Sequence, residues 1–122
     1  LLDAGAAPQV VLVSTARRTR ETWEQVAPSF PDADVRFLRT LYLAPAEMIR
    51  VEALRAGAER VMIVGHNPGL QDMAMGMARG FTPLEEMVRA KYPTCAAALF
   101  VRRQEDGDWT LQAFLTPRNA VL

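Results

Sequence analysis

The 122-residue sequence has almost none of the residues that hold small domains together by disulfides or metals. Its single cysteine, Cys95, excludes an intrachain disulfide framework and fits a reducing compartment. Its single histidine, His66, cannot complete a zinc site of the usual nitrogen and sulfur kind with that one cysteine. A metal held by carboxylates alone stays open, but no cluster of Asp and Glu suggests it. We therefore expect no metal and no cofactor.

Excess charge and long apolar runs are missing as well. Fourteen basic residues face fourteen acidic ones, and this zero net charge argues against nonspecific nucleic-acid binding. No apolar run approaches the roughly 18 to 20 residues of a membrane span, and no signal peptide is recognisable. We expect a cytoplasmic protein that binds neither nucleic acid nor a membrane.

The composition is ordinary for a globular domain, with 50% hydrophobic and 23% charged residues. The length suits one domain over residues 1–122 and is too short for two. The first eight residues contain Gly5 and Pro8 and are typical of a helix end that runs into a loop. There is no initiator Met, so we expect further residues upstream of Leu1.

Apolar, β-branched runs alternate with helical patterns along the chain. Strands are expected at 10–14, 35–38, 61–64, 94–102 and 109–115. Helices are expected at 17–27, 45–56, 68–79 and 82–91, and an Asp-Gly hairpin turn at 105–108. This order predicts an α/β sandwich with a mixed sheet.

The three longer helices should each have an apolar face that packs on the sheet. The residues of these faces are Thr22 and Val26 with Trp23 beside them, then Met48, Ile49, Val51 and Leu54, and finally Leu70, Met73, Ala74 and Met77.

The segment Val61 to Gly69 is the most informative part of the sequence. An apolar run ends at Gly65, His66 follows, and Asn67 leads into a helical pattern. Open α/β sheets bind ligands where strands end and helices begin, and a helix start favours an anion. We therefore expect a site for a phosphate or another oxyanion at His66.

An earlier segment has the same design: the strand 10–14 ends at Ser14 and is followed by Thr15, Ala16, Arg17 and Arg18. If the two strands are parallel in one sheet, both turns lie at one edge, and Arg18 and His66 could converge on one anion. The planar guanidinium suits phosphate, and Ser14 or Thr15 could add a hydroxyl donor.

Each of these residues also has a plainer interpretation. A lone histidine is more often structural than functional, and arginines at a helix start are commonly solvated. Tyr42 is expected to serve packing, with pocket lining as the alternative. Ser14 is disfavoured as a hydrolase nucleophile because the sequence has no G-x-S-x-G motif, and the glycines at 65–69 do not form a Walker loop.

The motifs resemble those of the histidine phosphatase superfamily. V-L-V-S-T-A-R-R-T-R-E-T, residues 11–22, is similar to its S-x-x-x-R-(A/T)-x-x-T motif, and V-G-H-N-P-G, residues 64–69, to its second-histidine motif. L-Y-L-A at 41–44 and Y-P-T-C at 92–95 look like the small SixA-type phosphohistidine phosphatases. The resemblance implies a phosphoglycerate mutase-like fold, a three-layer α/β/α sandwich with a mostly parallel mixed sheet.

The resemblance also implies roles for individual residues. Arg18 takes the place of the second arginine and His66 that of the second histidine, both catalytic and phosphate-binding. Ser14 begins the arginine loop and Asn67 shapes the histidine turn, and both are expected to bind phosphate. The activity implied is a metal-independent phosphatase with a phosphohistidine intermediate.

One departure from the family is plain: the sequence has no Arg-His-Gly motif and no second histidine. The nucleophile and the first arginine are therefore expected upstream of Leu1, and no carboxylate at 38–43 can be assigned as the proton donor. A catalytically inactive domain that binds a phosphorylated ligand is the alternative, and a purely structural domain is a third possibility.

The spacing of the motifs bears on the substrate. Only 22 residues lie between Leu43 and His66, which leaves no room for a large lid. An open site suits phosphohistidine on a protein, with small phosphoesters as the other substrate class.

Overall fold

The computed structural model describes residues 7–66, 69–77, 95–102 and 109–115. In chain order its elements are β1 (Val10–Ser14), α1 (Arg17–Val26), η2 (Ala27–Ser29), β2 (Asp34–Leu38), η3 (Arg39–Leu41), α2 (Ala46–Arg55), β3 (Arg60–His66), α3 (Gly69–Met77), β4 (Cys95–Arg102) and β5 (Trp109–Leu115). The predicted alternation of strands and helices is confirmed within these ranges. The helix expected at 82–91 and the turn expected at 105–108 lie outside them.

The five strands form one mixed sheet in the order β2-β1-β3-β4-β5. The strand β1 pairs in parallel with both β2 and β3, whereas β4 is antiparallel to both β3 and β5. Every strand except β4 therefore runs in the same direction. A continuous apolar run such as V-V-L-V in β1 is typical of a parallel strand that is covered on both faces.

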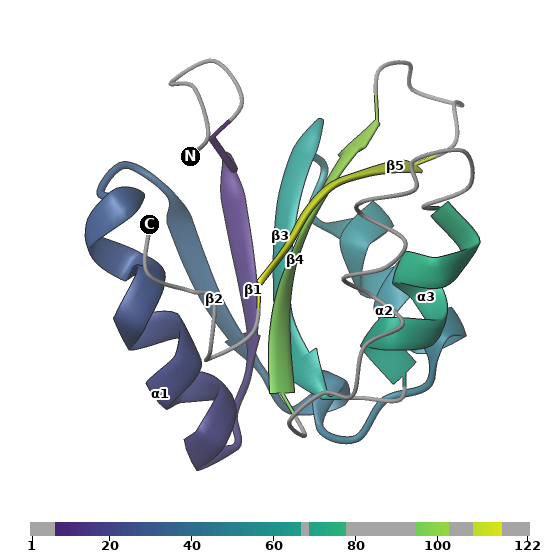
Figure 1. Cartoon of the computed structure of the whole chain (residues 1–122), viewed down its shortest axis with the longest axis horizontal. Coiled ribbons are helices and arrows are strands. Elements are labelled where there is room, and N and C mark those ends of the chain that lie inside the picture. The colour runs from purple at the N-terminus through teal and green to yellow at the C-terminus, as the bar shows by residue number, and fades with distance from the viewer. Residues whose placement is uncertain (1–6, 67–68, 78–94, 103–108, 116–122) are drawn as a thin grey trace.

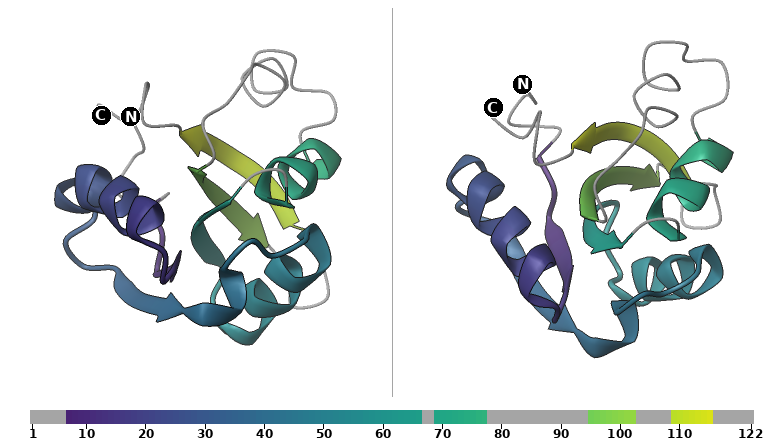
Figure 2. Two further views of the ribbon diagram at one scale, coloured as in Figure 1. Left: turned by 90° about the horizontal axis from the view of Figure 1, so that it is seen from below. Right: turned by 60° about the horizontal axis from the view of Figure 1, so that its bottom comes forward.

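Helices cover both faces of this sheet, as the three-layer expectation requires (Figure 1). The helix α1 lies on one side, and α2 and α3 lie together on the other (Figures 1 and 2). None of the described helices is long and apolar enough to cross a membrane.

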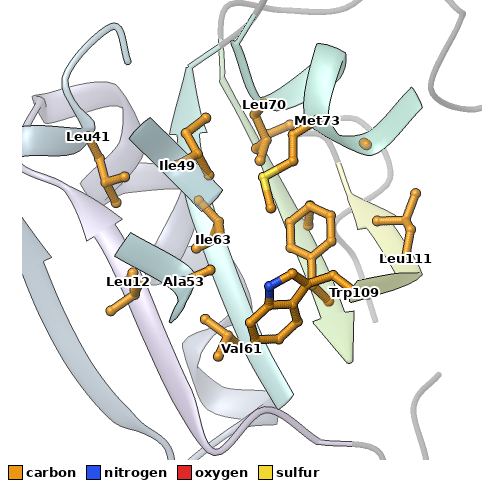
Figure 3. Packing of buried hydrophobic residues seen from close by; sticks show 14 of the residues in the cluster. Leu12, Leu41, Ile49, Ala53, Val61, Ile63, Leu70, Met73, Trp109 and Leu111 are labelled. Atoms are coloured by element: carbon orange, nitrogen blue, oxygen red, sulfur yellow. The ribbon is translucent and has the colours of Figure 1, made fainter. Parts of the chain in front are cut away.

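The sheet separates two hydrophobic cores because successive strand residues point to opposite faces. On the α1 side, the strand residues Val11, Val13, Met62 and Val64 pack with Trp23, Val26 and Phe30. On the other side, the strand residues Leu12, Val61 and Ile63 pack with Ile49, Ala53, Leu70 and Met73 (Figure 3). The apolar faces predicted for α1 and for the first part of α3 are therefore confirmed.

The apolar face predicted for α2 is wrong for three of its four residues. Ile49 is buried as expected, but Met48, Val51 and Leu54 are 39%, 40% and 46% exposed. The buried stripe of α2 instead consists of Ile49, Glu52 and Ala53. The small side chain of Ala53, fully buried four residues after Ile49, lets the helix approach the sheet closely, so the larger apolar residues are left on the outer side.

The strand β3 is longer than the sequence pattern predicts, and this places the histidine. The apolar pattern ends at Val64, but backbone pairing with β4 continues through Gly65, opposite Ala96, and His66, opposite Cys95. His66 is therefore the last residue of a strand, and its backbone is fixed by the sheet.

Candidate active site

Two strand–turn–helix units meet at one edge of the sheet. Because β1 and β3 are parallel neighbours with Val13 opposite Val64, both strands end at the same edge. The helix α1 begins three residues after Ser14, and α3 begins three residues after His66. This confirms the expected arrangement, in which both turns lie where ligands bind in open α/β sheets.

The side chains of Ser14 and His66 are joined by a buried hydrogen bond. Ser14 Oγ lies 2.9 Å from His66 Nε2, and the two residues are 0% and 7% exposed. Ser14 Oγ also accepts a long hydrogen bond of 3.4 Å from the backbone N–H of Ala16. Since Oγ has a hydrogen and two lone pairs, it can donate to an unprotonated Nε2 or accept from Nε2–H. The hydroxyl expected to bind phosphate is thus already bonded to the histidine.

Burial determines the charge of this histidine. Desolvation lowers the pKa of His66 below its usual value of 6.5. The ring is therefore mainly neutral at pH 7 in the ligand-free protein. An anion placed next to the ring would favour the protonated form and raise this pKa.

Two buried threonines fix the turn between β1 and α1. Thr19 Oγ1 lies 2.7 Å from the carbonyl oxygen of Ser14 and 2.8 Å from that of Ala16, and its hydrogen can bond to either. Thr22 Oγ1 donates to the carbonyl oxygen of Arg18 at 2.9 Å. Both threonines occupy positions of the arginine motif; Thr22 was expected only on the packing face of the helix, and Thr19 had no expected role. Their hydrogen bonds set the path of the backbone from Ser14 into the first turn of α1.

Arg18 lies in that first turn and is exposed. Neighbouring Arg17 pairs with Glu21 at 3.2 Å, whereas Arg18 has no ion pair or side-chain hydrogen bond among the described residues. The start of α1 has neither an acidic residue in its first turn nor a side-chain cap. A cation and uncapped backbone N–H groups at one helix start would together favour a bound anion.

Tyr42 contacts the histidine from a different part of the chain. Its ring meets the ring of His66 edge to face, with centroids 5.2 Å apart and an interplanar angle of 66°. Tyr42 is 57% exposed, so the expectation that it serves packing is not met, and it lies beside the candidate site instead. The only sign in the sequence that Tyr42 lies at the site was the L-Y-L-A motif, and this motif carries no information about a contact with His66.

Asn67 lies outside the described residues. Among the ranges that the structure describes, no three or more His, Cys, Asp or Glu side chains come together in a way that could hold a metal ion. The structure therefore brings Ser14 and His66 into direct contact and places Arg18 at the same edge of the sheet.

Comparison with known proteins yields matches of structure only. No family model matches the sequence, and no curated protein does. A structure from Agrobacterium tumefaciens, assigned as the phosphohistidine phosphatase SixA, matches with a TM-score of 0.63 and 29% sequence identity, over 90% of this chain and 68% of its own.

Two further structures share the fold at lower identity. One, from Nakamurella multipartita and also assigned as a SixA phosphohistidine phosphatase, has a TM-score of 0.65 and 24% identity over 91% of this chain and 72% of its own. The other, a phosphoglycerate mutase from Plasmodium falciparum, has a TM-score of 0.52 and 13% identity over 91% of this chain and 72% of its own. The fold expected from the motifs, phosphoglycerate mutase-like, is confirmed.

Proposed function

We propose that the protein is a metal-independent phosphatase acting on phosphohistidine in proteins or on small phosphoesters. Its structural neighbours support the histidine phosphatase superfamily and its SixA type. One observation carries the proposal. The buried His66 side chain is fixed at the carboxyl edge of the sheet, where the first turn of α1 presents Arg18, which has no partner within the described ranges.

The groups at this edge suit a phosphoryl group by their charge. Phosphoryl transfer depends mostly on positioning and on neutralising the charge of the phosphoryl oxygens. In this proposal Arg18 donates to these oxygens with its planar guanidinium. His66 donates from its ring once the anion has raised its pKa, and the N–H groups at the start of α1 add a partial positive charge.

The nucleophile has to come from elsewhere, because the one histidine of this sequence matches the second-histidine motif. The resemblance implies a histidine in an Arg-His-Gly segment, and we propose that the protein supplies it from residues upstream of Leu1. Its ring nitrogen would bond to phosphorus while the bond from phosphorus to the substrate breaks. Water would then release inorganic phosphate and restore the free histidine.

The proposed substrate class rests on the short stretch of chain between Leu43 and His66. Only 22 residues separate Leu43 from His66, and the structure fills them with α2 and β3. We propose an open site that admits a phosphorylated side chain on a partner protein, in a cytoplasmic protein without a metal or cofactor. Asn67 is proposed to bind phosphate beside Arg18 and His66.

A second candidate is a domain that binds a phosphorylated ligand without turnover. It is favoured by the single histidine, since the groups proposed here bind an anion but none of them is the nucleophile of the family. The two candidates differ in turnover and in the formation of a covalent phosphoenzyme, so they can be separated directly.

The test measures release of inorganic phosphate from a protein phosphorylated on histidine and from a small phosphoester, with the full protein that contains this chain. We expect turnover in the presence of a chelator and a phosphoenzyme that is stable in alkali and lost in acid. Arg18→Gln and His66→Asn should each lower kcat/KM by roughly 100-fold or more. Arg17→Gln is the matched control and should stay near wild type. Phosphate binding without turnover would support the second candidate, and neither binding nor turnover would contradict both.

A further inference from the structure

Two contacts of different kinds hold the His66 ring. The hydrogen bond from Ser14 fixes one point of the ring, because it joins Oγ to Nε2 alone. The edge-to-face contact with Tyr42 restricts the plane of the ring, with an interplanar angle of 66°. The ring is also held covalently at Cγ, so the bond at Nε2 still leaves its plane free to rock about the line through Cγ and Nε2. The tyrosine therefore supplies a restraint that the serine does not.

The segment that carries Tyr42 is itself fixed from both sides. Leu41 and Ala44 are 1% and 5% exposed, whereas Tyr42 and Leu43 between them are 57% and 65% exposed. The backbone N–H of Tyr42 donates to Arg39 O at 3.0 Å, and that of Ala44 donates to Leu41 O at 3.2 Å. The chain is thus anchored on the core immediately before and after the two exposed side chains.

The backbone of this segment is unusual at Leu43, whose φ is +50°. This left-handed conformation is uncommon for a residue other than glycine, and it turns the chain sharply between Tyr42 and Ala44. Non-glycine residues in such conformations tend to gather at functional sites. Here the turn lies directly beside the ring contact with His66.

A second close approach joins the same two segments. A Cβ added to Gly69 would lie 1.9 Å from Ala44 O, so only glycine lets the start of α3 pack against this backbone. Residues 42–44 therefore approach the end of β3 and the start of α3 at two places, the ring pair Tyr42–His66 and the backbone pair Ala44–Gly69. The placement of the tyrosine is tied to that of the histidine turn.

We infer that Tyr42 is a positioning residue that sets the plane of the His66 ring for the phosphoryl group. The inference rests on the proposed function, in which His66 donates to a phosphoryl oxygen. Exposure of more than half of Tyr42 means that burial of the ring contributes little to its place in the fold. The anchored segment instead holds the Tyr42 ring against His66. Misplacement of a reacting or binding group by about 1 Å can cost on the order of 100-fold in rate.

The closing experiment separates ring placement from activity. The signals of the His66 ring are identified in NMR spectra of the full protein as those lost in His66→Asn. Tyr42→Leu should move these signals, because it removes the aromatic ring 5.2 Å away, and Tyr42→Phe should restore them. Phe37→Leu removes another exposed aromatic ring and is the matched control, which should leave the signals in place.

Kinetics on the same variants complete the test. Tyr42→Leu should lower kcat roughly 10- to 100-fold with a smaller change in KM, and Tyr42→Phe should regain most of the loss. Unmoved ring signals in Tyr42→Leu, or moved signals with an unchanged kcat, would overturn the inference. A wild-type protein without turnover would overturn the proposed function instead, while the ring signals would still report whether Tyr42 contacts His66. Thermal unfolding of each variant verifies that it is folded.

Discussion

The two strand–turn–helix units at the carboxyl edge use their polar groups in opposite ways. In the unit β1–α1, the hydroxyls of Ser14, Thr19 and Thr22 all bond within the protein, whereas the exposed Arg18 in the first turn of α1 has no partner among the described residues. In the unit β3–α3, the polar group is the buried His66, held by contacts from other elements.

This difference shows that the two units contribute to the candidate site in different ways. The first unit is stabilised by its own side chains and presents a charge, whereas the second presents a ring whose placement depends on Ser14 from β1 and Tyr42 from the loop before α2. Changes in the second unit should therefore affect stability. Changes at Arg18 should affect binding alone.

The largest loss of stability is expected at Gly69, where the unit β3–α3 packs against Ala44. Gly69→Ala puts a Cβ 1.9 Å from Ala44 O, and a backbone atom cannot move aside as a flexible side chain can. We expect the free energy of unfolding to fall by about 3 kcal/mol, at the upper end for overpacking. Chemical denaturation measures this.

Gly65→Ala is the matched control in the same segment. Its added Cβ would meet only Ile63 Cγ2, at 3.7 Å, which is an ordinary contact. Gly65→Ala should therefore lower the free energy of unfolding much less than Gly69→Ala. Equal losses in the two variants would show that the approach of α3 to Ala44 is not what fixes the second unit.

Arg18→Gln should separate binding from stability in the first unit. The side chain is exposed and has no described partner, so unfolding should change by less than about 0.5 kcal/mol. Loss of a charged donor should weaken phosphate or vanadate binding by about 2 kcal/mol, or roughly 30-fold. Calorimetry of Arg18→Gln and Arg17→Gln gives the comparison, and equal weakening in both would assign the effect to general charge.

Ser14→Ala should break the link between the two units. The substitution leaves His66 Nε2 without its hydrogen-bond partner in a buried place, which costs about 1–2 kcal/mol of unfolding free energy. The exposed Ser29 is the control, and Ser29→Ala should change stability very little. If Ser14→Ala is as stable as wild type, the buried hydrogen bond contributes nothing to the fold.

The smallest effect expected is a pH dependence of stability that comes from His66. The pKa of His66 is lowered in the folded protein, so the unfolded chain binds the proton first as the pH falls. The contribution of His66 to the free energy of unfolding is fully present above about pH 6.5. It is lost as the pH falls through the lowered pKa. The difference in unfolding free energy between wild type and His66→Gln should therefore shrink or change sign from pH 7.5 to 5. A constant difference would contradict the lowered pKa.

The part of the fold that the sequence predicted well depends on local patterns. Runs such as V-V-L-V and V-M-I-V mark buried parallel strands by their side chains alone, and their parallel pairing then placed Ser14 and His66 at one edge. The end of β3 was missed because Gly65 and His66 pair through their backbones without an apolar pattern. Backbone pairing of this kind does not depend on the type of side chain, so the amino-acid sequence does not reveal it.

The features that the sequence did not predict depend on contacts between distant segments. The helix α2 buries Ile49, Glu52 and Ala53 in place of the predicted apolar face, because Ala53 packs in the core against the sheet. The contact of Tyr42 with His66 lies next to the left-handed backbone of Leu43, a conformation that leucine seldom adopts. The roles of Arg18, His66 and Ser14 at a phosphoryl group remain predictions that rest on their motifs and on this geometry.

A shared anion site formed by Arg18 and His66 can be tested by a double-mutant cycle in phosphate or vanadate binding with Arg18→Gln and His66→Asn. If the two units act on one anion, each single variant weakens binding, and the double variant weakens it by clearly less than the sum of the two losses. Strict additivity of the two losses, or unchanged binding in either single variant, would contradict a shared site at the carboxyl edge of β1 and β3.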